Sequence, residues 1–237
     1  MYEDSSCIVI NKPAGLAVQG GKSIGVSLDS ILAENYPQRP LLVHRLDRDT
    51  SGIILVARTK TAAAWFSGLL GGEGGAPAPA EKGVVKRYLA ICRGRPQQAE
   101  GTIRLDLAIR GAVKKSATRY RLLSSCCGEE DDFSLLELEL GTGRMHQIRR
   151  HLAMTGNPVL GDDKYGDFGL NRRLRRTMGV RRLMLHASRL IIPKMPATGA
   201  ENMVAAMHGS PPAGSRLDIS APLPEHFVKF LEISAMI

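Results

Sequence analysis

Residues 41–60 read LLVHRLDRDTSGIILVARTK. A short apolar lead-in, residues 41–43, runs into a polar segment, residues 44–52, and a wholly apolar run, residues 53–57, follows at once. Apolar runs this short and this rich in β-branched residues are typical of strands that are buried on both faces. The polar segment is therefore predicted to be a loop held between rigid elements, where a functional side chain is well positioned.

The loop carries two carboxylates, Asp47 and Asp49, and two guanidinium groups, Arg45 and Arg48. A solvated surface turn would tolerate this mixture of charges. Buried strands on both sides favour a different interpretation, because at least one charged group then points inward and needs a partner. The loop is the first candidate for a functional site.

Several separated stretches carry a family resemblance. HRLDRDTSGIILVA (residues 44–57), KRYLA (86–90) and GRMHQIRRHLAMTGNPVLGD (143–162), together with NKPAGLAVQGG (11–21), resemble the motifs of RluA-type pseudouridine synthases. Members of that family isomerise uridine to pseudouridine in structured RNA. The resemblance covers nearly the whole chain.

The resemblance implies roles for individual residues. Asp47 matches the catalytic aspartate, Tyr88 matches a tyrosine of the active site, and Arg149 matches an arginine that pairs with the catalytic aspartate. Without the resemblance, Tyr88 would be interpreted as a half-buried strand tyrosine and Arg149 as a surface arginine of a helix. Their catalytic assignment therefore depends on the family.

The same resemblance implies contacts with the substrate. Arg45 is expected to fill the space of the flipped nucleotide, and Thr50 is expected to hold the loop. Arg144 and His146 are expected to contact the RNA. Breaking the bond between uracil N1 and the ribose and rejoining the base at C5 needs neither redox chemistry nor a metal, so no cofactor is expected.

The bulk composition is compatible with an RNA partner. The 237 residues contain 43% hydrophobic residues, enough for an ordinary core, and the formal net charge is +9, which favours a polyanionic partner. The densest basic run lies within residues 171–182, without any acidic residue: Arg172, Arg173, Arg175, Arg176, Arg181 and Arg182. A solvated face is the ordinary interpretation of such a run, but pure arginine favours contact with RNA phosphates.

The N-terminal residues do not resemble a signal peptide, and no apolar run approaches membrane-spanning length. The four cysteines, Cys7, Cys92, Cys126 and Cys127, form no C-x-x-C pair, so free thiols in a reducing cytoplasm are expected. Cys126 and Cys127 are expected in an exposed loop. A cytoplasmic monomer that binds RNA and no membrane is the prediction.

Hydrophobic periodicity indicates the fold class. Alternation and short apolar runs predict strands at residues 6–10, 84–92, 103–110, 120–123, 135–140 and 183–192. Helical spacing predicts helices at residues 26–35, 61–70 and 225–231, and another from about Met145, with Met145, Ile148 and Leu152 as its apolar stripe. Few strand–helix–strand repeats occur. We therefore expect an α+β fold, the pseudouridine synthase fold, with a large mixed, mainly antiparallel sheet flanked by helices.

A single catalytic domain is expected over residues 1–237, with flexible insertions at about residues 71–83 and 197–214, where Gly, Ala and Pro are frequent. The Asp47 loop and the Arg149 helix are expected to meet in a cleft across the middle of the sheet. The chain is expected to lack the small N-terminal S4-like RNA-binding domain that many relatives carry.

The branch of the family and the target RNA are a further step. The motifs look most like the RluC-type branch, which modifies large-subunit ribosomal RNA, and transfer RNA is the alternative substrate. A non-catalytic RNA-binding protein on the same scaffold is a second possibility. A phosphatase of the dehalogenase type is a third, because Asp47-x-Asp49-Thr50 resembles its paired aspartates, but the spacing before Thr50 is one residue short.

Overall fold

The structure is a computed structural model that describes residues 1–21, 25–70, 83–109, 111–128, 131–196 and 214–236. The chain divides into two compact units. Unit 1 comprises Met1–Lys86 and Arg189–Ala221, and unit 2 comprises Arg87–Ser188 and Pro222–Ile237. The single domain over residues 1–237 stays a prediction. The two expected insertions lie outside the described residues, except for Gly83 and Gly214.

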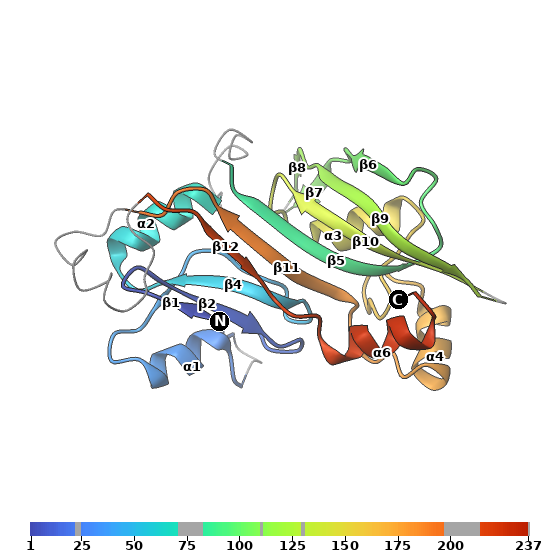
Figure 1. Cartoon of the computed structure of the whole chain (residues 1–237), viewed down its shortest axis with the longest axis horizontal. Coiled ribbons are helices and arrows are strands. Elements are labelled where there is room, and N and C mark those ends of the chain that lie inside the picture. Colours follow the sequence, from blue (N-terminus) through green and yellow to red (C-terminus); the bar gives the residue numbers. More distant parts are fainter. Residues whose placement is uncertain (22–24, 71–82, 110, 129–130, 197–213, 237) are drawn as a thin grey trace. The chain divides into compact units, whose positions relative to one another are not determined.

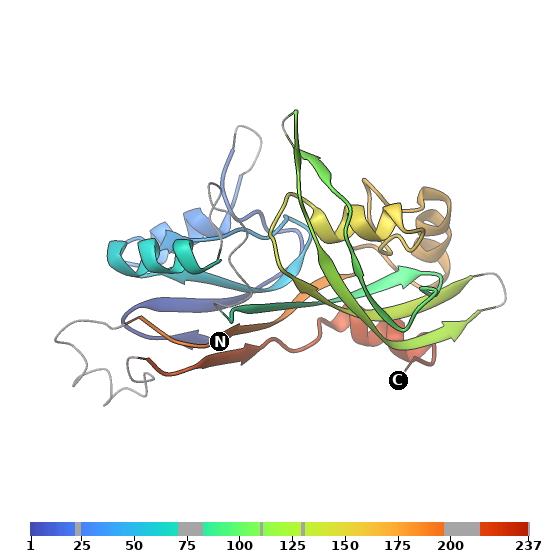
Figure 2. The same cartoon turned by 90° about the horizontal axis from the view of Figure 1, so that it is seen from above.

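Unit 1 is built on strands in the order β1-β2-β4-β11, with β3 paired to β4 and β12 paired to β11 (Figure 1). The strands are β1 Tyr2–Glu3, β2 Cys7–Lys12, β3 Leu41–Leu42, β4 Ser51–Ala57, β11 Leu185–Ile192, of which the second half lies in this unit, and β12 Leu217–Ser220. The helices are α1 Leu28–Asn35 and α2 Lys60–Leu70. Both lie on the same side of these strands (Figure 2).

Strand β4 is a buried strand, as its sequence predicts. All seven of its residues are buried, because β2 and β3 flank it and α2 covers it through Phe66, which has no exposed surface. Helix α1 begins with a reciprocal capping box between Ser27 and Ser30. It ends before Pro37, where a proline could not continue the helix.

Unit 2 contains the strand order β11-β5-β10-β9-β6 and a separate hairpin, β7-β8. The strands are β5 Val85–Arg93, β6 Glu100–Ile103, β7 Leu107–Ile109, β8 Ala112–Lys114, β9 Thr118–Cys127 and β10 Asp132–Leu140. The helices are α3 Gln147–Met154, α4 Phe168–Thr177 and α6 Glu225–Ile233. The pairs β5–β10, β10–β9 and β9–β6 are all antiparallel.

The sheet of unit 2 is covered on both sides. Helices α3 and α4 lie on one side and α6 lies on the other (Figure 2). On the α6 side, Phe133 of β10 meets Phe230 edge to face, with ring centroids 5.4 Å apart. On the other side, Ile148 and Leu152 of α3 join the buried core. Because strand side chains alternate between faces, neighbouring residues of β5 such as Arg87 and Tyr88 serve opposite sides of the sheet.

The α+β class with a mainly antiparallel sheet is confirmed, but the continuous strand predicted at residues 103–110 is wrong. Strand β6 ends at Ile103 and β7 begins at Leu107. The carbonyl of Leu105 between them accepts hydrogen bonds from Ser116 Oγ at 2.7 Å and from His151 Nε2 at 2.9 Å. Side chains thus take the place of a strand partner, and the apolar alternation continues across the break.

Two other local predictions also differ from the structure. Met145 lies outside α3 and is 54% exposed, so it does not belong to the apolar stripe, which Ile148 and Leu152 form without it. Cys126 and Cys127 end strand β9 instead of occupying a loop. All four cysteines are free thiols, as predicted, and burial raises the pKa of Cys7 and Cys92.

None of the helices in the described part of the chain combines the length and the apolar character needed to span a membrane.

Candidate active site

Asp47 lies in the loop between β3 and β4 of unit 1, as the sequence predicts. The loop is anchored at both ends by the buried side chains of Val43, Leu46 and Thr50. A backbone hydrogen bond from Thr50 N to Asp47 O, 3.2 Å long, closes a tight turn. Asp47 is therefore a half-buried carboxylate on a short, fixed turn that leads directly into the most buried strand of the unit.

The buried side chain of Lys12 anchors this loop by a hydrogen bond to its backbone. It is fully buried, and its ammonium group donates to the carbonyl oxygens of Pro13, Leu16 and Arg48 at 3.0, 2.8 and 2.9 Å. Arg48 O also accepts from Gly15 N at 2.9 Å, and Arg48 Nε donates to Gly15 O at 3.1 Å. The NKPAG turn and the Asp47 loop are thus joined at Arg48, the residue after Asp47, through its carbonyl and its side chain.

The ammonium of Lys12 is a buried cation held by neutral oxygens. Desolvation lowers its pKa to about 8, although the nearby negative charges of Asp49 and Asp47 favour the charged form. An ammonium has three N–H donors, and all three are matched by carbonyl oxygens. We call these three hydrogen bonds the Lys12 clasp. Deprotonation of the ammonium would remove one of its three donors and therefore break one bond of the clasp.

His44, the first residue of the HRLD motif, is a structural residue. Its Nε2 accepts a hydrogen bond from the backbone N–H of Leu55 at 3.0 Å. Desolvation, with a smaller contribution from the positive charge of Lys86, lowers the pKa of His44 to about 3. The imidazole is therefore neutral and ties the start of the loop to the middle of β4.

Tyr88 lies on β5 in unit 2, opposite Leu138 of β10 and partly buried against the core. This is the half-buried position that its strand alternation predicts. Ala90 and Cys92, on the same face of the strand, are completely buried. Tyr88 is therefore the last side chain on this face before β5 enters the core.

Arg149 in α3 is buried and makes a two-pronged ion pair. Its Nε donates to Asp162 Oδ2 and its Nη2 donates to Asp162 Oδ1, both at 2.7 Å, and Nη2 also reaches Asp163 Oδ1 at 3.2 Å. The side chains of Arg149 and Asp162 are only 5% and 1% exposed. Short, parallel bonds of this kind hold a guanidinium in one orientation.

The turn that follows Asp162 also holds its carboxylate in place. Its Oδ1 also accepts from the backbone N–H groups of Lys164 and Tyr165, both at 2.9 Å. Burial opposes ionisation, but Arg149 and the two N–H groups outweigh that effect, so the pKa of Asp162 is lowered. The Asp162 carboxylate is a fixed anion that orients Arg149.

The glycines around Asp162 permit this close packing. A Cβ at Gly161, where φ is +70°, would lie 2.0 Å from Arg182 O, and a Cβ at Gly166 would lie 2.3 Å from Asp162 O. Both positions therefore exclude any side chain. Within the motif GDDKYG, the two glycines allow the backbone to pack closely, and the first aspartate forms the ion pair with Arg149.

Tyr165 links Arg149 to His146. The guanidinium carbon of Arg149 lies 5.4 Å from the Tyr165 ring centroid, and the Tyr165 hydroxyl is 3.0 Å from His146 Nδ1. His146 has a left-handed backbone, with φ of +53°, just before α3. Such a conformation is strained for a residue other than glycine and is found at functional sites and sharp turns. Here it turns the chain into α3.

Gln147 and His151 attach α3 to β9. Gln147 Nε2 donates to Ala117 O at 2.9 Å and Thr118 Oγ1 at 3.1 Å, while its Oε1 accepts from Thr142 Oγ1 and Arg144 N. His151 is completely buried and lies 2.9 Å from Thr118 Oγ1 and Leu105 O. Of the HQIR segment, Gln147 and Ile148 are thus anchors, and Arg149 is the residue held in place by Asp162.

The predicted site residues are divided between the two units. Arg45, Asp47 and Thr50 lie in unit 1, and the others lie in unit 2. Arg45 is exposed, whereas Thr50 is buried, and its hydroxyl finds no hydrogen-bond partner among the described residues. Arg144 is half-buried, and its Nε likewise has none within the part of the chain that the structure describes. The expected meeting of the Asp47 loop with Arg149 would join the two units and stays a prediction.

The arginine run forms α4 and the turn after it. Arg172, Arg175 and Arg176 are exposed, as are Arg181 and Arg182. Arg173 differs from them, because its guanidinium forms a close ion pair with Asp131, which also lies near Arg93. The sequence makes these arginines equivalent, whereas the structure separates Arg173 as an anchor of the helix.

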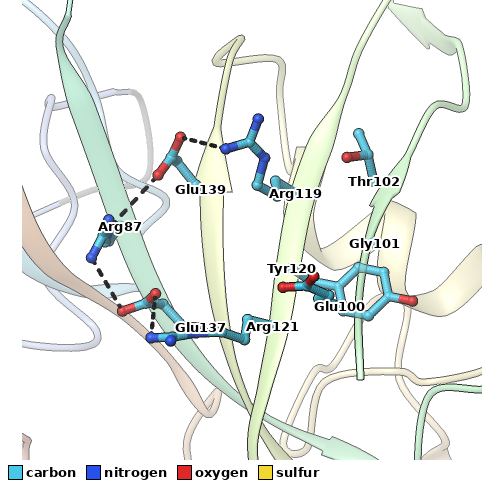
Figure 3. A pocket seen from close by; sticks show the side chains of 9 residues that line it. All are labelled: Arg87, Glu100, Gly101, Thr102, Arg119, Tyr120, Arg121, Glu137 and Glu139. Carbon is cyan, nitrogen blue, oxygen red and sulfur yellow. Dashed lines mark hydrogen bonds and ion pairs between the residues drawn. The ribbon is translucent and has the colours of Figure 1, made fainter. Parts of the chain in front are cut away.

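A hollow of about 580 Å³ lies over β5, β10, β9 and β6 (Figure 3). Its floor is an alternating row of charges that we call the charge ladder: Arg119, Glu139, Arg87, Glu137 and Arg121. Arg87 projects from the face of β5 opposite to Tyr88. The hollow is therefore separate from the side of the sheet that carries α3 and Arg149.

Among the described residues, no group of three His, Cys, Asp or Glu side chains is arranged to hold a metal ion.

Several residues of these networks, among them Lys12, Asp162 and Tyr165, carried no assigned role in the sequence. Lys12 and Asp162 lie in the motifs NKPAG and GDDKYGD, each within two residues after a short apolar run, and a charge in that position is a signal for a buried, partnered group. Their actual partners, which are backbone carbonyls for Lys12 and Arg149 for Asp162, could be identified only from the structure.

Comparison with known families identifies the chain. A family model described as RNA pseudouridylate synthase matches residues 6–154, which include Asp47, Tyr88 and Arg149. This chain belongs to the RNA pseudouridylate synthase family. The match confirms the resemblance inferred from the motifs.

Relatives in the RNA pseudouridylate synthase family agree. The chain is 39% identical over 181 residues to ribosomal large subunit pseudouridine synthase C of Rickettsia prowazekii, which covers 70% of this chain and 56% of the relative. It is 35% identical over 215 residues to the enzyme of the same name from Escherichia coli, covering 84% and 63%. The chain thus matches little more than half of the length of these relatives.

Solved structures of the family share the fold. Human RNA pseudouridylate synthase domain containing 4 superposes with a TM-score of 0.70 at 25% identity, covering 98% of this chain and 90% of the other. Human RNA pseudouridylate synthase domain containing 1 gives a TM-score of 0.65 at 27% identity, covering 94% and 82%. The pseudouridine synthase fold expected from the sequence is therefore confirmed.

Proposed function

We propose that this chain is an RNA pseudouridine synthase that isomerises uridines in structured RNA, with large-subunit ribosomal RNA as its target. The observation that carries the proposal is the family match over residues 6–154, together with the Asp47 turn that Lys12 clasps inside it. The names of the bacterial relatives support ribosomal RNA as the target. The protein acts in the cytoplasm as a monomer and needs no cofactor.

In this proposal, the reaction proceeds at Asp47. The N1–C1′ bond of uridine breaks, the base turns, a C5–C1′ bond forms, the proton at C5 leaves and N1 gains a proton, so the atoms balance. The Asp47 carboxylate stabilises or attacks the electron-poor centre during these steps. Arg149, which two hydrogen bonds to Asp162 hold in one orientation, is the partner that we assign to the Asp47 carboxylate.

Other predicted residues take supporting roles. Tyr88 packs on the uracil and assists removal of the C5 proton. Arg45, exposed near Asp47 in the loop, fills the space that the flipped nucleotide leaves, and the buried side chain of Thr50 holds the loop through its packing. Arg144 and His146, before α3, contact the RNA. Flipping a nucleotide costs about a few kcal/mol and least in irregular RNA, which favours loops of folded RNA as substrates.

The test is release of tritium from ribosomal RNA transcripts that carry 5-tritiated uridine, in the presence of EDTA. We expect wild type to release tritium and Asp47→Asn to lose about 10³-fold in rate or more, as for loss of a principal catalytic group. Asp49→Asn is the matched control, since it removes a carboxylate from the same loop, and it should keep most of the activity.

An Asp47→Asn variant with substantial activity would overturn the assignment of Asp47. Absence of release from large-subunit RNA with wild type would direct the test to transfer RNA. Absence of release from both RNAs, with RNA binding retained, would leave a non-catalytic RNA-binding protein on this scaffold.

A further inference from the structure

We propose that the outward face of α4 binds unpaired nucleotides of the RNA: Phe168 stacks on a base, and Arg172, Arg175 and Arg176 bind the flanking phosphates. The proposal rests on the proposed function for the identity of RNA as the partner. It goes further by naming a surface of unit 2 and the kind of RNA segment that fits it. We call these four residues the α4 stripe.

The α4 stripe follows from the periodicity of the helix. Leu170 and Leu174, four residues apart, are buried and define the inward face. Phe168, Arg172 and Arg176 are also spaced by four residues, and Arg175 is seven residues after Phe168, so all four share the opposite face. All four are exposed, and 58% of Phe168 is accessible.

The electrostatics of this surface are one-sided. Residues 168–182 contain no acidic side chain. The nearest acid before them, Asp167, is already engaged, because it accepts from Leu170 N at 2.9 Å and from Arg93 at 2.6 Å. Arg173, directed to Asp131, is the anchored member of the run. The exposed guanidinium groups are thus left to bind phosphate, which they do with two parallel hydrogen bonds.

The aromatic ring of Phe168 makes the surface selective for unpaired nucleotides over duplex RNA. A single exposed apolar residue is ordinary on a protein surface, but an aromatic ring among guanidinium groups is the combination that binds single-stranded nucleic acid. Gly169 adds no side chain beside the ring, and a Cβ there would lie 3.4 Å from Asp167 Oδ1. The base of an unpaired nucleotide can stack on such a ring, whereas bases inside a duplex are already stacked.

Asn171 fixes the α4 stripe relative to Arg149. Its Oδ1 accepts from Gly161 N and its Nδ2 donates to Asp162 O, both at 2.9 Å. Asp162 in turn holds Arg149. A binding surface that is rigid before the ligand arrives loses less entropy on binding, so the tie favours α4 as a preformed docking site within unit 2.

The experiment compares the affinities of the whole protein for two fluorescent RNAs: an unstructured strand of about 12 nucleotides, within the site size of single-strand binders, and the same strand paired with its complement. We expect Phe168→Ala to weaken binding of the unpaired strand about tenfold and to change duplex binding less than about twofold. Phe168→Tyr should restore binding. Ile233→Ala, which removes a comparably exposed apolar residue from α6, is the matched control and should behave as wild type.

The salt dependence separates the ring from the charges. Arg172→Gln should reduce the slope of log affinity against log salt by about 0.7, the value for one contact to a single-stranded phosphate, whereas Phe168→Ala should leave the slope unchanged. Equal losses on duplex and unpaired RNA, or no loss in Phe168→Ala, would overturn the proposal. So would a lower sedimentation coefficient of Phe168→Ala without RNA, which would assign this face to a second copy of the chain.

The outcome is independent of the tritium assay. If wild type releases tritium but Phe168→Ala binds unpaired RNA normally, the proposed function stands and the α4 stripe is wrong. If no RNA releases tritium but Phe168→Ala selectively loses unpaired RNA, the α4 stripe stands and the proposed reaction fails.

Discussion

On one face of the unit 2 sheet, Arg87 lies between Glu137 and Glu139, at 3.7 and 3.6 Å, and the side chains keep roughly a quarter to a third of their surface exposed (Figure 3). On the side that α3 covers, Arg149 meets Asp162 through two bonds of 2.7 Å, and both side chains are buried. The same pair of chemical groups is used in both places, but water competes for the first pair and is excluded from the second.

The buried ion pair fixes the position of a side chain, whereas the exposed ion pairs mainly keep the sheet surface polar. Exposed ion pairs contribute about 0–1 kcal/mol, because water and salt screen them. A buried pair contributes little net stability when intact, but it is costly to break, because one partner is left charged without compensation. Substitution of Asp162 is therefore expected to lower the free energy of unfolding strongly, whereas substitutions in the charge ladder are expected to change it little.

The largest expected effect is that of Asp162→Asn. This substitution leaves the shape nearly unchanged but deprives the buried Arg149 of its anion, so the free energy of unfolding should fall by about 3 kcal/mol. Arg149 should also lose its fixed orientation, and the rate of pseudouridine formation should fall. Urea unfolding and the tritium assay measure the two effects.

Asp163→Asn is the matched control for this substitution. Asp163 contacts the same guanidinium at 3.2 Å, but its side chain is 82% exposed, so the loss should stay within about 1 kcal/mol. Equal destabilisation by the two variants would remove the contrast between buried and exposed pairs. The lowered pKa of Asp162 also means that its pair stabilises the fold above the unfolded carboxyl's value of 3.8 and is lost only as the pH falls through its lower, folded value.

Lys12 differs from both kinds of ion pair, because it is a buried cation whose direct contacts are neutral carbonyls. Its pKa of about 8 predicts that raising the pH through 8 removes one donor from the clasp on Arg48 O, so kcat/KM should fall above this pH. Between about 8 and the unfolded value of 10.5, the unfolded chain binds more protons at this group, so its contribution to the free energy of unfolding rises.

Activity and this contribution to stability should therefore move in opposite directions, which distinguishes the effect from unfolding. A pH profile of wild type and Lys12→Met, with urea unfolding at each pH, tests it. The variant should have lower activity without the alkaline fall, and an unchanged fall in Lys12→Met would assign it to another group.

The smallest effect is expected for Glu139→Gln in the charge ladder. Glu139 lies 3.6 Å from Arg87 and 3.8 Å from Arg119, and both arginines remain accessible to water after the change. The free energy of unfolding should change by less than about 1 kcal/mol, and kcat should be unchanged. A loss comparable to that of Asp162→Asn would show that the hollow above the ladder has a role beyond a solvated sheet face.

Much of the fold was predictable because its signals are local. The buried strand β4, the end of α1 before Pro37 and the turn at Asp47 all follow from the order of apolar, polar and proline residues. The break between β6 and β7 was not predictable, because alternation continues through Leu105 while distant side chains, Ser116 and His151, bind its carbonyl. Helix α4 was also missed, because its charged face hides an inward stripe of only Leu170 and Leu174.

The sequence by itself determined the family, the α+β class and the candidate residues Asp47, Tyr88 and Arg149, because motifs and periodicity are properties of neighbouring residues. Only the tertiary structure decided the partners of the charged groups. Arg149 is held by Asp162, Arg173 is directed to Asp131, and Lys12 is matched by three carbonyls. The physical reason is that a charge reveals in the sequence that it needs compensation, but which group compensates it depends on what folding brings within about 3 Å, the length of a hydrogen bond.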